Sequence, residues 1–312
     1  MATTSMPHFA CPVDKTMLDE SFCCASCGRI YPVVGGVPVL INENNSLFNI
    51  QDYVVQGQAY YLGASGYAGH LDKRRGLRHL YRRLVFRLSE SGPVRRDYDA
   101  QAAVQHIRDC MPDAQILVIG AGDTSFPGNI TYTDVAFGKN VTCIADAHDL
   151  PFPDASFDAV LACAVLEHVI DPYRCVVEIQ RVLKPKGYVF AETPFMQPVH
   201  MREHDFTRFT YLGHRRLFRY FDEIQSGMAG GAGISAGQIL RYTLASFSDR
   251  PSVRKWLKLT GLLITYPFRW LDLFLYTRCS AYDSASAFYF FGTLRSDPVP
   301  DREILHSYRG SC

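Results

Sequence analysis

The sequence lacks a long apolar run and carries almost no net charge, and each absence excludes a class of protein. No stretch holds about 18 consecutive uncharged apolar residues, the length a helix needs to cross a bilayer, so no transmembrane span is expected. The formal net charge is +1, so nucleic acid or anionic lipid would need a local basic patch. The first residues are not a basic stretch followed by an apolar one, which favours a cytoplasmic protein with reduced cysteines.

A chain of 312 residues, of which 47% are hydrophobic, can hold one full α/β domain and a small additional module. Shifts in composition divide it into a cysteine-bearing module at 1–45, a connector at 46–113, a main domain at 114–297 and a tail at 298–312. We expect the tail to be loosely ordered.

The main domain opens with four β-prone apolar residues, Ile116 to Ile119, that lead into the turn Gly120-Ala121-Gly122. This pattern is typical of a buried parallel strand that ends where the backbone approaches a ligand closely. Two more predicted strands end in acids, at Asp134 and Asp146. In a doubly wound sheet, ligands bind beyond the carboxyl ends of the strands, so these residues are candidate binding groups.

The same alternation of strand and helix continues along the chain. Strands are expected at 158–162 and 188–192, with Glu167 and His168 just after the first of them. Between these strands, Asp171 is a good N-cap for a helix. Glu167 and His168 therefore fall at the sheet edge that carries the glycine turn, where they either line the pocket or transfer a proton.

Taken in order, these segments resemble the class I S-adenosylmethionine (SAM)-dependent methyltransferases, in particular the type 11 group. The resemblance implies a Rossmann-like α/β fold with a seven-stranded sheet and SAM as cofactor. It also implies that the turn Gly120-Ala121-Gly122 faces the methionine end of SAM and that Asp134 accepts hydrogen bonds from the ribose hydroxyls. Asp146 and Ala147 would meet the adenine, and Glu167 would line the cofactor pocket.

Two features depart from this family pattern. The third glycine of the fingerprint is missing, and only about ten residues separate the first strand from the second, fewer than a parallel crossover usually needs. We therefore expect the customary helix between these strands to be reduced to a turn.

The module at 1–45 contains two knuckles that begin with cysteine, and their spacing predicts a zinc ribbon with the ligands Cys11, Asp14, Cys24 and Cys27. The following segment, 31–40, resembles the small zinc-ribbon proteins that activate tRNA and translation-factor methyltransferases. Asp14 stands where that pattern has a cysteine. Three interpretations stay open: a zinc site with Asp14 as an oxygen ligand, a zinc site in which Cys23 replaces Asp14 because the loop bends, and a metal-free hairpin module. All three give the ribbon a structural role.

The connector contains an apolar helical pattern from Leu77 to Leu88, and the opposite face carries Arg74, Arg75, Arg78, Arg82 and Arg87. This face either covers the main domain as a solvated surface or binds an anion such as RNA phosphate or a lipid headgroup.

The acceptor side is expected after the fifth strand of the main domain, in the titratable loop 193–210. His200 and His204 are candidate bases there, with a metal pair or a purely structural role as alternatives, and Asp205 and Arg208 are expected to pair. A glycine-rich loop is predicted at 227–237. The apolar insertion at 238–280 is interpreted as a helical cap, a lid, or a peripheral membrane contact through 256–276.

Three functions are consistent with these patterns. The first is a SAM-dependent methyltransferase that acts on an oxygen or nitrogen of a small-molecule or saccharide- or lipid-linked acceptor. The second is an RNA or protein methyltransferase that uses the ribbon for recognition. The third is a non-catalytic SAM-binding scaffold.

Overall fold

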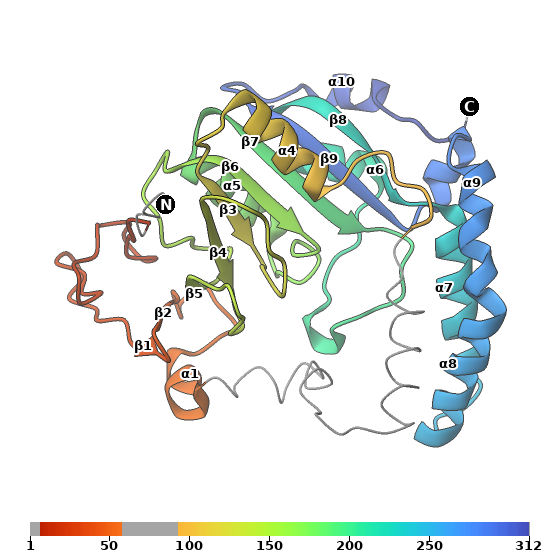
Figure 1. The fold of residues 1–312 in the computed structure, drawn as a ribbon, viewed down its shortest axis with the longest axis horizontal. Coiled ribbons are helices and arrows are strands. Elements are labelled where there is room, and N and C mark those ends of the chain that lie inside the picture. Colours follow the sequence, from red (N-terminus) through yellow and green to blue (C-terminus); the bar gives the residue numbers. More distant parts are fainter. Residues whose placement is uncertain (1–6, 58–92, 312) are drawn as a thin grey trace.

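The computed structural model describes residues 7–57 and 93–311. In these ranges the protein forms a nine-stranded sheet with the order β1-β2-β5-β4-β3-β6-β7-β9-β8 (Figure 1). The basic helix expected at 74–88 lies outside the described residues. The strands are β1 (Val33–Val34), β2 (Val37–Leu40), β3 (Ile116–Ile119), β4 (Ile130–Asp134), β5 (Cys143–Ala145), β6 (Phe157–Cys163), β7 (Leu183–Pro194), β8 (Phe221–Gly230) and β9 (Ala287–Leu294).

Strands β3 to β9 form the seven-stranded sheet that the sequence predicts. β3 to β7 run parallel, and β9 lies antiparallel between β7 and β8. The short link from β3 to β4 contains no helix, as its length predicts. All the carboxyl ends of the parallel strands therefore meet at one edge, where the glycine turn and the acids lie.

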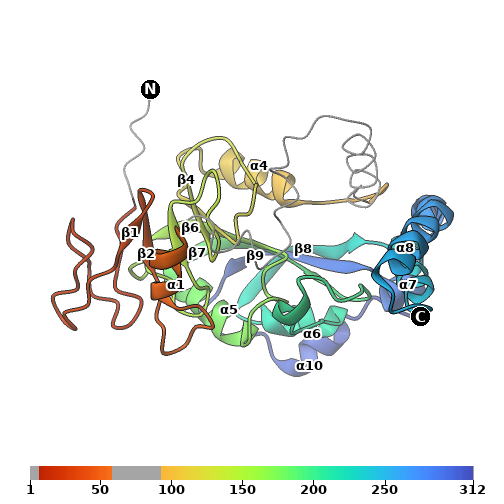
Figure 2. The same cartoon turned by 90° about the horizontal axis from the view of Figure 1, so that it is seen from below.

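Helices cover both faces of this sheet (Figure 2). α4 (Ala100–Cys110) lies on one face, while α5 (Pro172–Val182), α6 (Tyr211–Leu217) and α10 (Asp301–His306) lie on the other. α4 begins after the N-cap Asp99, and α5 after the predicted N-cap Asp171. The presence of α10 shows that the expectation of a loosely ordered tail was wrong.

Alternate residues of the central strands supply two hydrophobic cores. Leu117 packs with Val160 and Ile179 on the α5 face, whereas Ile116 packs with Leu161 and Ile107 on the α4 face. Because successive side chains of a strand point to opposite faces, a strand buried on both sides must be apolar throughout. This explains the unbroken apolar sequence of β3.

The ribbon, which we define as residues 7–45, joins the same sheet. Its β1–β2 hairpin turns at Gly35 and Gly36, both with positive φ, as a two-residue hairpin turn of type I′ requires. β2 then pairs parallel with β5 through Val39 and Leu40. The short helix α1 (Ile50–Gln56) follows. The ribbon thus extends the sheet of the main domain at the β5 edge.

The insertion forms a helical hairpin, which we define as α7 (Ala232–Ala245), α8 (Pro251–Thr265), η4 (Tyr266–Leu271) and α9 (Asp272–Leu275). It stands beside the sheet at the end opposite the ribbon (Figures 1 and 2). The remaining 3₁₀ helices are η3 (Arg202–His204) and η5 (Cys279–Ser284). Among the described residues, no helix combines the length and apolarity that crossing a bilayer requires.

The glycine-rich loop predicted at 227–237 is wrong, because β8 continues to Gly230 and α7 begins at Ala232. Several of these glycines serve close packing. A β-carbon on Gly233 would lie 2.4 Å from the carbonyl oxygen of Phe268, and one on Gly237 would lie 3.1 Å from that of Thr265. Glycine here lets α7 approach the rest of the hairpin.

Candidate cofactor and acceptor site

The glycine turn and the acid at the end of β4 are directly bonded. The backbone N–H of Gly122 donates to Oδ2 of Asp134 at 2.8 Å, and the N–H of Ala136 donates to Oδ1 at 2.9 Å. The N–H of Ala121 donates to the carbonyl of Thr133 at 3.0 Å. Gly120 and Gly122 have φ of 64° and 51°, a region that favours glycine. The structure therefore brings together the predicted turn and the predicted ribose-binding carboxylate.

Asp134 is partly buried at this edge. Burial raises the pKa of its carboxyl group, and the amides of Gly122 and Ala136 oppose that shift. Each oxygen already accepts one backbone hydrogen bond and has a further lone pair. A diol that donates to both oxygens fits this carboxylate chemically.

Asp146 lies on the same edge, because β5 runs parallel to β4 with Asp134 opposite Ile144. Its Oδ2 accepts from Ser46 Oγ at 2.5 Å, and its Oδ1 lies 2.6 Å from Nδ1 of His148. The N–H of Asp171 donates to Nε2 of His148, so Nδ1 carries the ring proton and donates to Asp146. Although burial raises the pKa of Asp146, the bond from His148 holds it below its ordinary value.

Asp146 thus holds the connector in place by accepting a hydrogen bond from Ser46. The sequence did not reveal this structural role. The neighbouring Ala147 is buried. Contact of this pair with adenine stays a prediction.

The loop after β6 packs against the glycine turn. Ala164 has a φ of 53°, which is uncommon for a residue with a side chain, and Val165 follows it directly over Gly120. This loop carries Glu167, whose side chain is fully buried. Among the described residues, no group donates a hydrogen bond to either of its carboxylate oxygens.

Two histidines face Glu167. Nε2 of His168 and Nε2 of His200 each lie 3.7 Å from its Oε1. The two imidazole rings meet edge to face, with centroids 4.7 Å apart. Burial lowers the pKa of His168, and the Glu167 carboxylate opposes that shift. We call Glu167, His168 and His200 the trio.

The loop 195–210 leaves β7 and extends beyond the carboxyl ends of the strands (Figure 1). It is held by the carbonyl of Glu167, which accepts from the N–H of Phe206 at 2.8 Å and of Thr207 at 3.2 Å. Asp205 and Arg208 pair, as expected, with one bond at 2.6 Å. Although burial raises the pKa of Asp205, the Arg208 guanidinium holds it below its ordinary value.

The two candidate bases point to different places. The ring of His200 turns to Glu167, whereas the ring of His204 stacks on Phe48 with centroids 6.0 Å apart. The main-chain carbonyl of His204 accepts from Nδ1 of His168 at 2.7 Å. The structure therefore groups His200 with Glu167 and His168, and the i, i+4 metal pair with His204 does not form.

The sequence did not single out Glu192, which lies near the carboxyl end of β7. It forms an ion pair with Arg96 of the connector. Burial raises the pKa of Glu192, and Arg96 opposes that shift. The only sequence signal was its position at a strand end, which it shares with Asp134.

The four predicted ribbon ligands converge. Sγ of Cys11 lies 3.7 Å from Sγ of Cys27, and Sγ of Cys24 lies 3.4 Å from each oxygen of Asp14. All four ligand atoms lie within 4.8 Å of one another. A tetrahedral zinc site with Zn–S bonds of about 2.3 Å places its sulfurs about 3.8 Å apart, so the spacing fits this metal.

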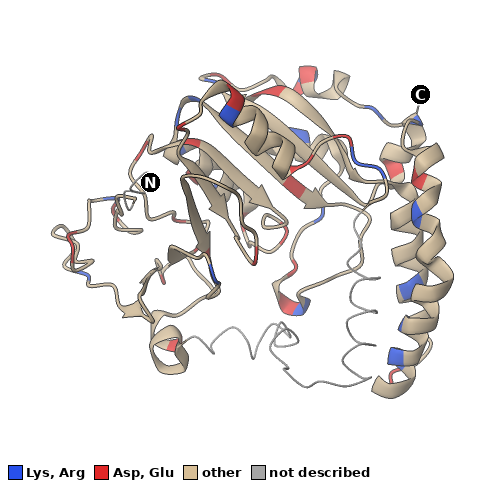
Figure 3. Cartoon of the chain, viewed as in Figure 1, with Lys and Arg blue, Asp and Glu red and all other residues tan. Residues whose placement is uncertain are grey.

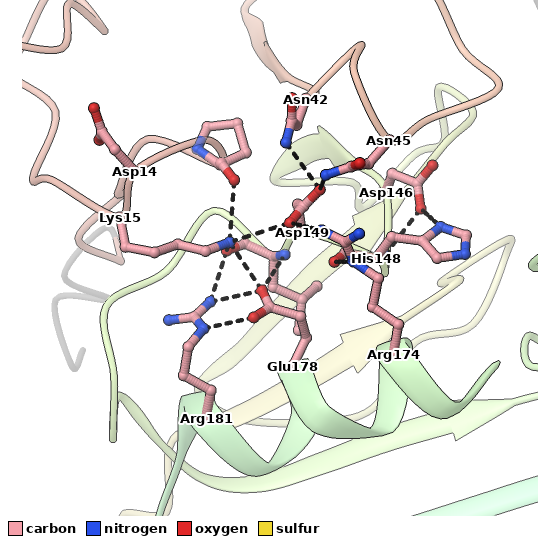
Figure 4. A network of polar contacts seen from close by, with 12 residues as sticks. Asp14, Lys15, Asn42, Asn45, Asp146, His148, Asp149, Arg174, Glu178 and Arg181 are labelled. Carbon is pink, nitrogen blue, oxygen red and sulfur yellow. Dashed lines mark hydrogen bonds and ion pairs between the residues drawn. The ribbon is translucent and has the colours of Figure 1, made fainter. Parts of the chain in front are cut away.

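A polar network fixes the ribbon to the main domain (Figure 4). Nζ of Lys15 lies 2.9 Å from Oε2 of Glu178, which also pairs with Arg181. Asp149 accepts from both Asn42 and Asn45 at 3.0 Å. Although burial raises the pKa of Glu178, Arg181 and Lys15 hold it below its ordinary value.

A cleft of about 400 Å³ opens elsewhere, at the amino ends of the strands. Ile116, Thr131 and Phe157 line it together with His8 and Met17 of the ribbon. It lies at the sheet edge opposite the glycine turn, so it is distinct from the site described above.

Part of the chain is similar to known proteins. Residues 127–191 match the family model described as a methyltransferase domain. A 121-residue segment is 31% identical to a demethylmenaquinone methyltransferase of Clavibacter sepedonicus, and covers 38% of this chain and 44% of that protein. A 98-residue segment is 34% identical to a probable S-adenosylmethionine-dependent methyltransferase of Mycolicibacterium smegmatis, and covers 28% of this chain and 37% of that protein. The chain therefore spans less than half the length of these relatives.

Among solved structures, a phosphoethanolamine N-methyltransferase 2 of Haemonchus contortus in complex with SAM is similar, with a TM-score of 0.42 and 13% identity over 81% of this chain and 61% of that one. The family match and these relatives thus make the central part of the chain similar to methyltransferases.

Proposed function

We propose that this protein is a SAM-dependent methyltransferase whose cofactor lies over the β3–β4 edge of the sheet. The main support is the 2.8 Å hydrogen bond from the N–H of Gly122 to Asp134, which places a side-chain-free turn next to a carboxylate. In this arrangement the turn Gly120-Ala121-Gly122 accommodates the methionine part of SAM. Asp134 accepts from the ribose hydroxyls, and Asp146 with Ala147 borders the adenine.

The methyl group would then lie toward the loop after β6 and the loop 195–210. Methyl transfer from a sulfonium is an in-line displacement, so the protein mainly has to orient the acceptor and exclude water. An oxygen acceptor must also lose a proton. Of the two predicted bases, His200 is the one turned toward Glu167.

The acceptor class is a small molecule or a saccharide- or lipid-linked intermediate. The names of similar proteins include a C-methyltransferase of ubiquinone and menaquinone biosynthesis and a 27-O-demethylrifamycin SV methyltransferase, so they leave the acceptor atom open. The ribbon and the hairpin stand at opposite ends of the sheet (Figure 1). Each of them could therefore bind a part of the acceptor that lies outside the cofactor site.

We further propose that the hairpin lies on a membrane surface and thereby favours a lipid-linked acceptor. Its outer side exposes large apolar side chains, including Trp256 at 67% and Phe274 at 75%. Between 232 and 284 the chain has seven Lys and Arg against three Asp, and the basic residues of α8 line the same hairpin (Figure 3). Apolar side chains flanked by cations are typical of helices that lie in the interface of an anionic bilayer.

The ribbon site is proposed to hold a structural zinc ion through Cys11, Asp14, Cys24 and Cys27. Although burial opposes ionisation of the Cys24 thiol, the backbone N–H groups of Cys27 and Ser26 lower its pKa and so favour the thiolate that zinc binds. Purified protein should contain zinc, and a Cys27→Ser variant should contain less; equal zinc in both would contradict this site.

The activity is tested by incubating the purified protein with SAM labelled in the methyl group and with cell extract, and then fractionating the labelled products. We expect one labelled product class that disappears in an Asp134→Ala variant. SAM binding without any transfer would instead support a non-catalytic scaffold. Labelled RNA, with binding that weakens as salt rises, would support the nucleic-acid alternative.

A further inference from the structure

The trio contains a buried carboxylate that accepts no hydrogen bond from a described residue. Both carboxylate oxygens of Glu167 are buried, and no described residue donates a hydrogen bond to them. An ionised carboxylate in such a place is costly unless a cation compensates it. Nε2 of His168 and Nε2 of His200, each 3.7 Å from Oε1, are the polar atoms that the structure places opposite it.

The ring of His168 cannot satisfy Glu167 by an ordinary hydrogen bond. Its Nδ1 lies 2.7 Å from the carbonyl oxygen of His204, which can only accept, so Nδ1 carries a proton. In the neutral ring, Nε2 then presents a lone pair to the carboxylate. A protonated Nε2 at 3.7 Å would be too far away for a normal hydrogen bond.

We propose that the trio binds a first-row divalent metal ion through Oε1 of Glu167 and the Nε2 atoms of His168 and His200. The three ligand atoms lie within 4.8 Å of one another. Two ligands that are each about 2.1 Å from one ion lie about 3.0 to 3.6 Å apart, so the 3.7 Å distances need only a small inward shift. Two imidazoles and one carboxylate suit zinc, iron(II) and manganese(II).

The surroundings of His168 support this assignment. Metal-binding histidines usually donate their second ring nitrogen to a carbonyl or carboxylate, which fixes the ring. Nδ1 of His168 donates to the His204 carbonyl. Nδ1 of His200 lies 3.4 Å from Oδ2 of Asp205 and 3.5 Å from Nη2 of Arg208, so these two side chains fix its ring. Asp205 is in turn held by Arg208 and by the backbone N–H of His200.

Three protein ligands leave coordination positions open for a further ligand. The side chain of His200 is 37% exposed, so the ion would be reachable from the acceptor side. If the proposed methyltransferase function holds, an acceptor hydroxyl bound to the ion would release its proton to water more easily. The oxygen would then bond to the methyl carbon while the carbon–sulfur bond breaks and its electron pair stays on sulfur. His200 would serve as a ligand rather than as the base.

The test uses full-length protein freed of metal by dialysis against a chelator and titrated with Co²⁺, with absorbance and calorimetry as readouts. A Cys11→Ser, Cys24→Ser, Cys27→Ser variant removes the three cysteine ligands of the ribbon site. We expect this variant still to bind one Co²⁺, with visible d–d bands and without thiolate-to-cobalt charge transfer. Adding His200→Ala should weaken that binding at least tenfold, whereas adding His204→Ala, the control in the same loop, should leave it unchanged.

The proposal is overturned if the ribbon variant binds no Co²⁺, or if the His200→Ala and His204→Ala variants titrate alike. Circular dichroism of each variant shows that the fold is intact. SAM affinity, measured in the same samples, separates this result from the proposed function. Cobalt binding without SAM binding would support the metal site and contradict the proposed methyltransferase function. SAM binding without cobalt binding would contradict the metal site and leave the proposed function standing.

Discussion

A β-carbon placed on Gly120 would lie 2.3 Å from Cγ2 of Val165, so the turn after β3 and the loop after β6 touch at a position that admits no side chain. Gly120 also has a positive φ of 64°. This contact links the two halves of the site, because Val165 lies on the loop that carries Glu167.

Gly120→Ala should therefore destabilise the protein by about 2 to 4 kcal/mol, through backbone strain and overpacking together. Chemical denaturation measures this change. Gly36→Ala is the matched control, because Gly36 has a φ of 85° with open space around its β-carbon position, so only strain applies. Equal losses in the two variants would show that Val165 can move away.

The raised pKa of Asp134 predicts how the stability of the protein depends on pH in the absence of SAM. A folded-state pKa above the unfolded value means that the folded state binds the proton more tightly, so stability should rise as pH falls through the folded pKa and level off below the unfolded value near 3.8. An Asp134→Ala variant should lack this part of the pH dependence. Thermal unfolding as a function of pH measures it, and identical pH profiles of the original protein and the variant would contradict the prediction.

Glu178→Gln should loosen the ribbon from the main domain. It removes the negative charge shared by Lys15 and Arg181 and replaces one acceptor oxygen by an NH2 donor, and breaking one partner of a buried pair costs about 3 kcal/mol. We expect a lower unfolding midpoint and faster proteolysis within 7–45. The control is Asp301→Asn at the exposed pair with Arg216, which should cost less than about 1 kcal/mol. Similar effects in both variants would show that the network does not anchor the ribbon.

The proposed membrane surface of the hairpin predicts co-sedimentation with vesicles that contain anionic lipid, and weaker binding as salt rises. Leu263→Glu and Phe274→Glu introduce charge at positions that are 61% and 75% exposed, and should abolish binding without unfolding. Leu305→Glu, at an exposed leucine of α10, should bind like the original protein. If both hairpin variants still bound the vesicles, the membrane contact would have to lie elsewhere on the protein.

The sequence predicted much of this arrangement because its signals are local. The apolar strand before Gly120, the acid at the end of β4 and the N-cap Asp171 each follow from a few neighbouring residues. The ribbon ligands converge for the same reason, since knuckle spacing restricts where Cys11 and Cys27 can lie.

The rest depends on contacts between distant parts of the chain. Glu167 and His200 are 33 positions apart in the sequence and meet only because the loop 195–210 folds back onto the carbonyl of Glu167. The parallel pairing of β2 with β5 could not be expected from the ribbon alone. The glycines of α7 were misinterpreted as a loop, because composition does not distinguish a flexible glycine from one that permits close helix packing.

Calorimetric titration of SAM into the original protein and into Asp134→Ala tests the cofactor site most directly. The variant should bind SAM more weakly by about 1 to 3 kcal/mol, the usual scale for lost hydrogen bonds to a charged group, or about 5- to 150-fold in Kd. Asp158→Ala, at the amino end of β6 and paired with Lys184, should leave the affinity unchanged. Equal SAM affinity in the original protein and in Asp134→Ala would contradict a cofactor site at the β3–β4 edge.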